Sequence, residues 1–300
     1  MYKRQIEKKV FLEWIDDENP DIVCIQETKA KVEQLGSSLI KDHGYYTYWH
    51  SAERPGYSGV ATFCRNEPYY VQKGLGIDKF DSEGRVLITE HENFLLYNIY
   101  FPNGQKDEIR LNYKLDFYDE LLPIINEQVD SGSNVIVAGD WNTAHHPIDL
   151  ARPKDNIKTS GFMPIEREKL DQYVDSGWTD TFRCFNKDAE RYSWWTYRFG
   201  ARERNVGWRI DYFFVNESFI SNIENTQEIK NVVKKLKDKG FPESSIHNLV
   251  YRPWGSYQSM LKGDRWQVKL INVKSGEQLS LQKHQYRSEH WVVVKGKAKV

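Results

Sequence analysis

The sequence predicts an α/β fold in which two packed β-sheets carry helices on their outer faces, followed by a smaller all-β module. Through most of the chain, short apolar runs typical of buried strands alternate with longer helical patterns. Several of these runs end at acidic or amide residues. The character of the sequence changes near residue 225, and from residue 250 the pattern is that of strands alone. We therefore expect three parts: a first domain at 1–226, a helical linker at 227–249 and a short all-β module at 250–300.

The composition is that of a soluble globular protein and excludes several classes. The sequence contains no apolar stretch of about 18 residues, so it offers no membrane-spanning helix. Residues 1–10 are polar and lack the apolar segment of a secretory signal. The three cysteines are far apart, which predicts neither a disulfide framework nor a cysteine metal site. These features predict a cytoplasmic protein. The net charge of −1 argues weakly against nucleic acid as a partner, although an enzyme that visits DNA needs only a local positive patch.

The first half of the chain predicts one helix and four strands. The helix covers 6–17, where apolar residues recur near one face, and Asn19-Pro20 ends it. An apolar run predicts a buried strand at 21–26. The other strands are 59–65 and two hairpin partners, 85–90 and 94–101.

The second half begins with a long helix at 108–129 and a buried strand at 134–138. A polar loop then runs to about residue 164, and a charged helix follows it to about residue 175. Short aromatic-rich strands are predicted at 192–197 and 209–215. A lysine-rich helix at 227–239 leads into the strand patterns RWQVKLINV, QLSLQ and HWVVVKG.

Four acidic or amide residues stand where predicted strands end or begin: Glu27 in IQE, Asp140 and Asn142 in VAGDWN, and Asp211 in WRIDYF. Mg²⁺ prefers oxygen ligands of this kind and keeps several waters. Any one of them is most simply a turn or cap residue. Together, on separate elements of one sheet system, they indicate a functional site.

Two turns add to this pattern. Gly139 permits a sharp turn after its strand, so that Asp140 and Asn142 could address one site, one as a base and the other as a hydrogen-bond donor; an Asx turn is the plain alternative. Tyr100 and Asn103 close another strand in YFPN. They could contact a phosphate, but on local grounds an aromatic edge followed by a Pro-Asn turn is the favoured interpretation.

The segment 194–211 combines aromatic side chains with arginines. Arg198, Arg204 and Arg209, interleaved with residues such as Trp208, suit contacts to phosphate and stacking on a sugar or base. A solvated charged loop is the alternative. In the third part, His284 and Glu289 have the spacing of a metal cluster, but Tyr286 interrupts the usual histidine pair, which favours no metal there.

The first part resembles the exonuclease III / AP endonuclease branch of the endonuclease/exonuclease/phosphatase superfamily over about 5–225. The motifs that carry the resemblance are DIVCIQETK, YSGVATFCR, NIYFPNG, VIVAGDWNTAHHPIDLARPK, SGFMPIERE and WWTYRFGARERNVGWRIDYFFV. The last motif separates this branch from the phosphatases and sphingomyelinases of the superfamily. The resemblance implies a two-sheet α/β sandwich and Mg²⁺-dependent (or Mn²⁺-dependent) hydrolysis of duplex DNA, at abasic sites or from 3′ ends.

The resemblance also implies roles for individual residues. Glu27, with Asp140 and Asn142, would hold the metal; Asp140 would deprotonate or orient the attacking water and Asn142 would stabilise the transition state. Asp211 would orient a catalytic histidine. The residues expected to contact the DNA are Tyr100 and Asn103 at the scissile phosphate, and Arg198, Arg204, Trp208 and Arg209 at the backbone and abasic sugar.

The family pattern has two further strands. It opens with a strand similar to ISWNVNGIRA and closes with one similar to GSDHCPV, whose aspartate and histidine complete the site. The sequence begins after the first of these and leaves the pattern near Thr226. We therefore expect a sandwich without its first and last strands, and impaired nuclease activity.

Residues from about 228 onward resemble the cupin part of a mannose-1-phosphate guanylyltransferase / type II mannose-6-phosphate isomerase, through VYRPWGSYQSM and YRSEHWVVVKGKAKV. Glu289 matches the cupin spacing, and Tyr286 departs from its two-histidine form. Three interpretations follow. The chain is a DNA-repair phosphodiesterase, a sugar-phosphate cupin module with a passenger domain, or a chimera without function.

Overall fold

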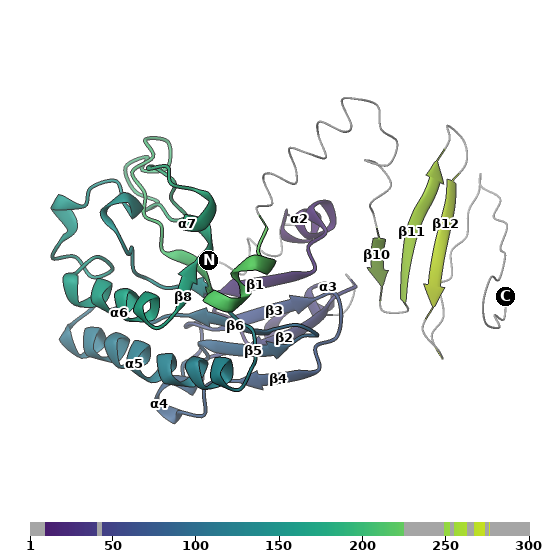
Figure 1. Cartoon of the computed structure of the whole chain (residues 1–300), viewed down its shortest axis with the longest axis horizontal. Coiled ribbons are helices and arrows are strands. Elements are labelled where there is room, and N and C mark those ends of the chain that lie inside the picture. Colours follow the sequence, from purple (N-terminus) through teal and green to yellow (C-terminus); the bar gives the residue numbers. More distant parts are fainter. Residues whose placement is uncertain are drawn as a thin grey trace. The chain divides into compact units, whose positions relative to one another are not determined.

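The computed structural model describes residues 10–40, 44–224, 249–252, 255–262, 267–273 and 276 (Figure 1). The chain divides into two compact units, Met1–Phe241 and Pro242–Val300. None of the helices within those described ranges is long and apolar enough to cross a membrane.

The first unit contains two β-sheets. The smaller sheet is antiparallel and has the strand order β1 (Ile22–Gln26), β3 (Val60–Cys64), β2 (Tyr46–His50). The larger sheet has six strands, of which β6 and β7 run parallel and the other neighbours antiparallel. Its order is β4 (Tyr70–Lys73), β5 (Val86–Glu90), β6 (Leu95–Tyr100), β7 (Val135–Asp140), β9 (Asp211–Asn216), β8 (Trp178–Asp180).

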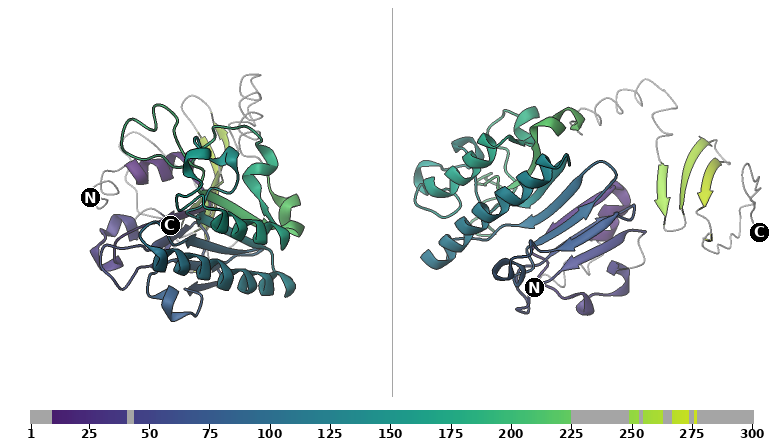
Figure 2. Two further views of the ribbon diagram at one scale, coloured as in Figure 1. Left: turned by 90° about the vertical axis from the view of Figure 1, so that its left-hand side faces the viewer. Right: turned by 60° about the horizontal axis from the view of Figure 1, so that its bottom comes forward.

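Helices cover the outer faces of both sheets. Figure 1 and Figure 2 show α5 (Glu108–Asp130) and α6 (Pro164–Asp175) side by side along the larger sheet. Helix α2 (Val10–Glu18) packs on the smaller sheet, because its Ile15 belongs to the same buried cluster as Phe63 of β3. The short helical segments are α3 (Ser37–Ile40), α4 (Asp78–Asp81), α7 (Thr181–Phe185), η1 (Val32–Gln34), η2 (Pro147–Asp149), η3 (Lys154–Asn156) and η4 (Glu217–Asn222).

The main core lies between the larger sheet and helices α5 and α6. Trp141, at the end of β7, is fully buried and stacks on Phe101 with ring centroids 4.3 Å apart. The contact between the two sheets is polar by comparison. Asn98 of β6 donates to the carbonyl oxygen of Ala61 (2.8 Å) and accepts from Gln26 (2.7 Å). These buried hydrogen bonds fix how the two sheets meet, because an unpaired amide between them would be costly.

Most of the predicted elements of the first unit are confirmed, including the two-sheet α/β architecture. The strand predicted at 192–197 is wrong: the structure has only an isolated bridge between Trp194 and Trp208 there, within a segment of turns. The strand predicted at 209–215 begins at Asp211. Strands β2, β4 and β8 are present but were not expected from the sequence, because YTYWH, YVQK and WTD are short and largely half-buried or exposed. The helix predicted at 227–239 lies outside the described residues.

The second unit contains an antiparallel meander of β10 (Leu249–Arg252), β11 (Gly255–Lys262) and β12 (Gln267–Val273). Its register shifts between Ser259 and Leu261, as at a β-bulge. The strand patterns QLSLQ and HWVVVKG, with His284 and Glu289, lie outside the described residues.

Gly139 is the backbone feature that lets β7 end where it does. Its φ is +149°, and an added Cβ would lie 1.8 Å from the carbonyl oxygen of Ile99 on β6. We expect Gly139→Ala to destabilise the fold by about 3 kcal/mol, because the clash is with backbone that cannot rotate away. Gly132→Ala is the matched control, with positive φ but open space around the new Cβ. Urea unfolding that gave the two variants equal stability would contradict this account.

Candidate active site

Three of the expected site residues lie in one row across the larger sheet. Tyr100 on β6 is the register partner of Asp140 on β7, and Asp140 is in turn the partner of Asp211 on β9. Adjacent strands in a sheet are about 5 Å apart, so the three side chains are held near one another by the sheet itself. The structure therefore brings together residues that are more than 100 positions apart in the sequence.

Glu27 reaches this row from the other sheet. It directly follows β1 and has φ of +59°, an uncommon conformation for a residue other than glycine. Its carboxylate pairs with the Lys29 ammonium at 2.6 Å, and its charge adds to the effect of burial in raising the pKa of Tyr100. Since Glu27 also acts electrostatically on Asp140, both sheets contribute to a single acidic site.

Asn142 and Asn103 complete the site from two loops. The main-chain N–H of Asn142 donates to Asp140 Oδ1 (2.8 Å), so the Asx turn that the sequence offered as the plain alternative is present. The side chain of Asn142 donates to the carbonyl oxygen of Phe101 (2.9 Å) and accepts from Asn103 Nδ2 (3.1 Å). Asn142 holds this position with φ of +51°. The two amide side chains therefore form one hydrogen-bonded pair beside Asp140.

The carboxylates of the site repel one another. Burial raises the pKa of Asp140 to about 8, and the neighbouring Asp211 carboxylate adds to the rise, against the Asn142 N–H and the Lys114 ammonium. Withdrawal from water also raises the pKa of Asp211, although the Ser193 hydroxyl lowers it. Burial, followed by the charges of Glu27 and Asp140, raises the pKa of Tyr100 well above its usual value, so Tyr100 stays a neutral donor.

A divalent cation would relieve this repulsion. Within the described residues no three His, Cys, Asp or Glu side chains are grouped closely enough to hold a metal ion by themselves. Mg²⁺ commonly takes one or two carboxylates and fills its remaining positions with water and phosphate oxygens. Glu27 and Asp140, with the Asn142 amide, fit a site of that kind.

Arg85 contacts Tyr100, although no feature of the sequence singles Arg85 out. The Arg85 side chain is 2% exposed; it donates to the carbonyl oxygen of Tyr100 (2.8 Å) and lies over the Tyr100 ring. Glu83 neutralises it and also pairs with Arg110 at 2.7 Å. A charged residue at the start of a strand looks like a surface residue in the sequence, and only the fold shows that it is enclosed.

The arginine- and tryptophan-rich segment forms loops beside the row of strand ends. Arg198 and Arg204 are exposed, as expected for side chains that meet a phosphate backbone. Trp208 is half-buried, and its ring lies near Gly161, whose position also faces the carbonyl oxygen of Asn142. Between Arg198 and Trp208, the ring of Phe199 is 84% exposed. The segment therefore presents charged and aromatic side chains to solvent, and its Trp208 lies near the Asn142 turn.

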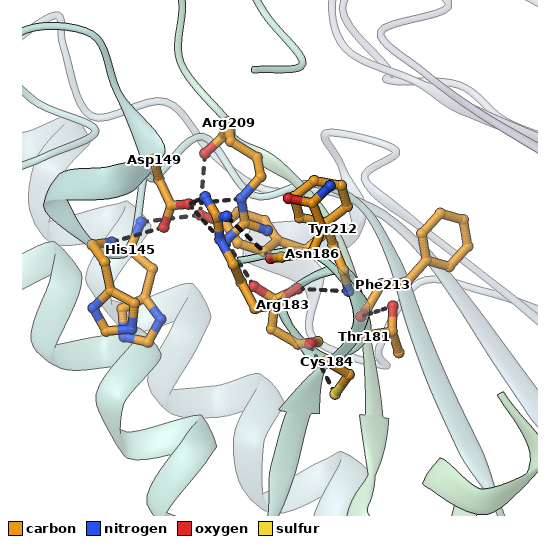
Figure 3. Close-up of polar contacts among 12 residues, drawn as sticks. His145, Asp149, Thr181, Arg183, Cys184, Asn186, Arg209, Tyr212 and Phe213 are labelled. Carbon is orange, nitrogen blue, oxygen red and sulfur yellow. Dashed lines mark hydrogen bonds and ion pairs between the residues drawn. The ribbon is translucent and has the colours of Figure 1, made fainter. Parts of the chain in front are cut away.

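Arg209 corrects an expectation. Its side chain is 3% exposed and makes ion pairs with Asp149 (Nε–Oδ1, 2.8 Å) and Asp180 (Nη2–Oδ2, 2.7 Å). Arg183 pairs with the same Asp149 oxygen at 2.6 Å, and Figure 3 shows both guanidinium groups converging on it. These carboxylates hold Arg209 in the interior, so it is not an exposed cation of the kind that the sequence predicted.

Family models match both units of the chain. Residues 3–223 match the model of the Endonuclease/Exonuclease/phosphatase family, and residues 239–300 match the model of the mannose-6-phosphate isomerase C-terminal region. Over 219 residues the chain is 42% identical to an exodeoxyribonuclease of Bacillus subtilis, covering 73% of this chain and 85% of that protein. It is 40% identical over 231 residues to the DNA repair nuclease APEX1 of Danio rerio, covering 73% of each.

Solved structures agree with this relationship. An AP endonuclease from Archaeoglobus fulgidus superposes with a TM-score of 0.64 at 27% identity, over 71% of this chain and 82% of that one. The catalytic domain of APE2 from Xenopus laevis gives a TM-score of 0.63 at 29% identity, over 70% and 78%. The motifs, the two sheets and these similarities lead to one conclusion: the chain belongs to the Endonuclease/Exonuclease/phosphatase family.

Proposed function

We propose that the chain is a divalent-metal-dependent DNA phosphodiesterase that acts on duplex DNA at abasic sites or 3′ ends, as in base excision repair. The observation that carries the proposal is the row of Tyr100, Asp140 and Asp211 facing Glu27, in a chain 42% identical to an exodeoxyribonuclease. A cytoplasmic location is part of the same proposal, since such an enzyme must reach DNA.

Asp140 is the proton acceptor in this proposal. Burial and the Asp211 charge raise the pKa of Asp140, which makes its carboxylate a stronger proton acceptor than an ordinary aspartate, and the Asn142 N–H keeps its oxygen oriented. Asp211 contributes by keeping that pKa high. A bound Mg²⁺ or Mn²⁺, held by Glu27, Asp140 and Asn142, would supply a Lewis acid for the phosphate oxygens.

The remaining residues bind and orient the phosphodiester. Tyr100 remains protonated and can donate to a phosphate oxygen, while the Asn103 and Asn142 amides offer N–H donors next to it. Arg198 and Arg204 meet the DNA backbone, and Trp208 lies against the abasic sugar. These contacts position the substrate, since phosphate contacts carry no sequence information.

The test is incision of a duplex oligonucleotide that carries one abasic-site analogue, in Mg²⁺ and then in EDTA. We expect a cut on the 5′ side of the lesion that requires Mg²⁺, together with slower shortening of the strand from its 3′ end. A folded preparation that neither cuts nor shortens the strand at any Mg²⁺ or Mn²⁺ concentration would refute the proposal.

A second candidate function rests on the match of residues 239–300 to the mannose-6-phosphate isomerase C-terminal model. In that case the second unit binds a sugar phosphate independently of the nuclease site. Mannose 6-phosphate is then expected to raise the melting temperature of the second unit, and His284→Ala is expected to abolish the rise. Calorimetry on the whole chain would measure it, and the absence of any shift at millimolar ligand would exclude this function.

A further inference from the structure

The core of the first unit contains an ion pair that the chemistry described so far does not use. Lys114 of α5 and Glu166 of α6 are both fully buried, and Lys114 Nζ lies 2.7 Å from Glu166 Oε1. Burying two charges costs several kcal/mol per ion before their attraction is counted, so a buried pair is weak evidence of a contribution to stability. Burial lowers the pKa of Lys114, and the negative charge of Glu166 acts in the opposite direction. Because stability alone does not explain this pair, its other contacts indicate its role.

Lys114 holds the catalytic turn. Besides Glu166, its ammonium donates to the main-chain carbonyl oxygen of Asn142 at 2.7 Å. That peptide belongs to the turn in which the Asn142 N–H orients the Asp140 carboxylate and the Asn142 side chain meets Asn103. With φ of +51°, Asn142 is in a conformation that isolated asparagine adopts only occasionally. A charged donor on its carbonyl oxygen therefore selects the conformation in which the site is assembled.

Glu166 forms hydrogen bonds with residues 160–163, which we call the 160–163 wall of the site. Its carboxylate accepts hydrogen bonds from the Gly161 N–H (2.6 Å), the Ser160 hydroxyl (2.8 Å) and the Met163 N–H (3.2 Å). Gly161 in turn accepts from the Ala144 N–H at 2.7 Å, two residues beyond Asn142. The pair thus joins the catalytic turn to the segment that lies against Trp208.

That second segment also borders a groove. Ser160 and Met163 line an open cavity of about 490 Å³, together with Lys158 and Gly104. Gly104 directly follows Asn103, which belongs to the amide pair of the site. Any displacement of 160–163 would change the distance between this wall and the Asp140 turn.

We propose that Lys114 and Glu166 are positioning residues, which fix the Asn142 turn and the 160–163 wall relative to each other. Neither touches substrate, since both are fully enclosed. Lys114 acts on catalysis through the Asn142 carbonyl oxygen, and Glu166 acts by holding Lys114 and the Gly161 amide. This inference rests on the proposed function for its kinetic consequence, but its structural consequence can be measured without any DNA.

The test compares Lys114→Met with the double variant Lys114→Met/Glu166→Gln. The single variant leaves an unpaired buried carboxylate, and its melting temperature is expected to fall by about 10 °C. In the double variant, glutamine is neutral. Its single amide oxygen can still accept from the Gly161 N–H, and its NH2 group can donate to the Ser160 hydroxyl oxygen, so the melting temperature is expected to return to within about 3 °C of the parent protein. The donor to the Asn142 carbonyl oxygen remains missing. If the pair positions the turn, kcat for abasic-site incision stays about 100-fold low while KM changes less than about threefold.

A matched control exists on the same two helices. Lys169 of α6 and Asp119 of α5 form a more exposed pair at 2.5 Å that does not touch the site. Lys169→Met/Asp119→Asn is expected to leave kcat unchanged. Recovery of the parental kcat in the Lys114→Met/Glu166→Gln variant would show that the buried pair is only a structural element, and would overturn the proposal.

Amide hydrogen exchange tests the positioning role of Lys114 and Glu166 even if the protein cleaves no DNA. The Asn142 and Ala144 amides are bonded to Asp140 Oδ1 and to the Gly161 carbonyl oxygen. In the Lys114→Met/Glu166→Gln variant we expect these two amides to exchange at least 10-fold faster, with the amides of β7 unchanged. Unchanged protection at Asn142 and Ala144 would overturn the proposal. Faster exchange in a protein that cleaves no DNA would leave it standing and refute only the proposed function.

Discussion

Asp140→Asn is expected to lower kcat for abasic-site incision by about 10³-fold, within the range for loss of a general base. The asparagine keeps the size of the side chain and can still accept from the Asn142 N–H, so the turn should survive. What disappears is the carboxylate whose pKa is raised to about 8 by burial and by Asp211. Single-turnover cleavage of an abasic-site duplex in saturating Mg²⁺ measures the effect without interference from product release.

The same variant should be more stable than the parent protein at pH 8 in EDTA, although its activity is lower. In EDTA, a carboxyl group whose pKa is higher in the folded state than in the unfolded chain makes the fold less stable as pH rises from about 4 to about 8. Asparagine carries no charge, so metal-free Asp140→Asn should melt at a higher temperature than the parent protein at pH 8 and at a similar temperature at pH 4. Asp116→Asn, on the exposed face of α5, is the control and should change neither activity nor melting. A variant that lost activity because it lost stability at pH 8 would contradict the assignment.

The residues that carry the proposed chemistry could be predicted because their signals are local. Asp140 and Asn142 follow an apolar strand through a glycine, and Tyr100 ends another, so each stands out within a few residues of sequence. That they form one row depends on strand order, and the parallel pairing of β6 with β7 is a property of the whole sheet. The resemblance to a family supplied that arrangement before the structure did.

The residues that position the site could not be predicted from local sequence patterns. Lys114 is fully buried, whereas Asp116, two positions along the same helix, is exposed. In the sequence both are charged residues of an amphipathic pattern, and the partner that makes Lys114 an interior residue is 52 positions away. Arg209 was misassigned for the same reason, since the acids that enclose it are 60 and 29 residues away. Whether a charged side chain is buried depends on partners far away in the sequence. The periodicity of apolar residues along one helix or strand cannot predict those partners.

Asp149→Asn should destabilise the first unit by about 3–5 kcal/mol, the largest effect on folding that we expect from a single polar substitution. Asp149 is fully buried and accepts from Arg209, Arg183 and the His146 N–H (2.9 Å). Burial alone would raise its pKa, but the hydrogen bonds and charges of Arg209 and Arg183 outweigh burial and hold the pKa below the usual value. The neutral variant would remove the only carboxylate that pairs with Arg183 among the described residues and would leave Arg209 paired with Asp180 alone. Arg209 Nη1 already lacks a hydrogen-bond partner among the described residues.

Urea unfolding measures this loss, with Asp188→Asn as the control. Asp188 is 67% exposed and pairs with Arg191 at 3.3 Å, so its replacement should cost less than about 0.5 kcal/mol. Because the pKa of Asp149 is depressed, its contribution should persist above pH 4 and disappear as the pH falls below that, so the variant and the parent protein should converge in acid. The same experiment separates the two roles considered for Arg209. If Arg209 contacted DNA, Asp149→Asn would free it and would alter KM for duplex DNA while the stability stayed nearly parental. If Arg209 is enclosed, Asp149→Asn lowers the free energy of unfolding, and KM changes only under conditions in which the protein unfolds.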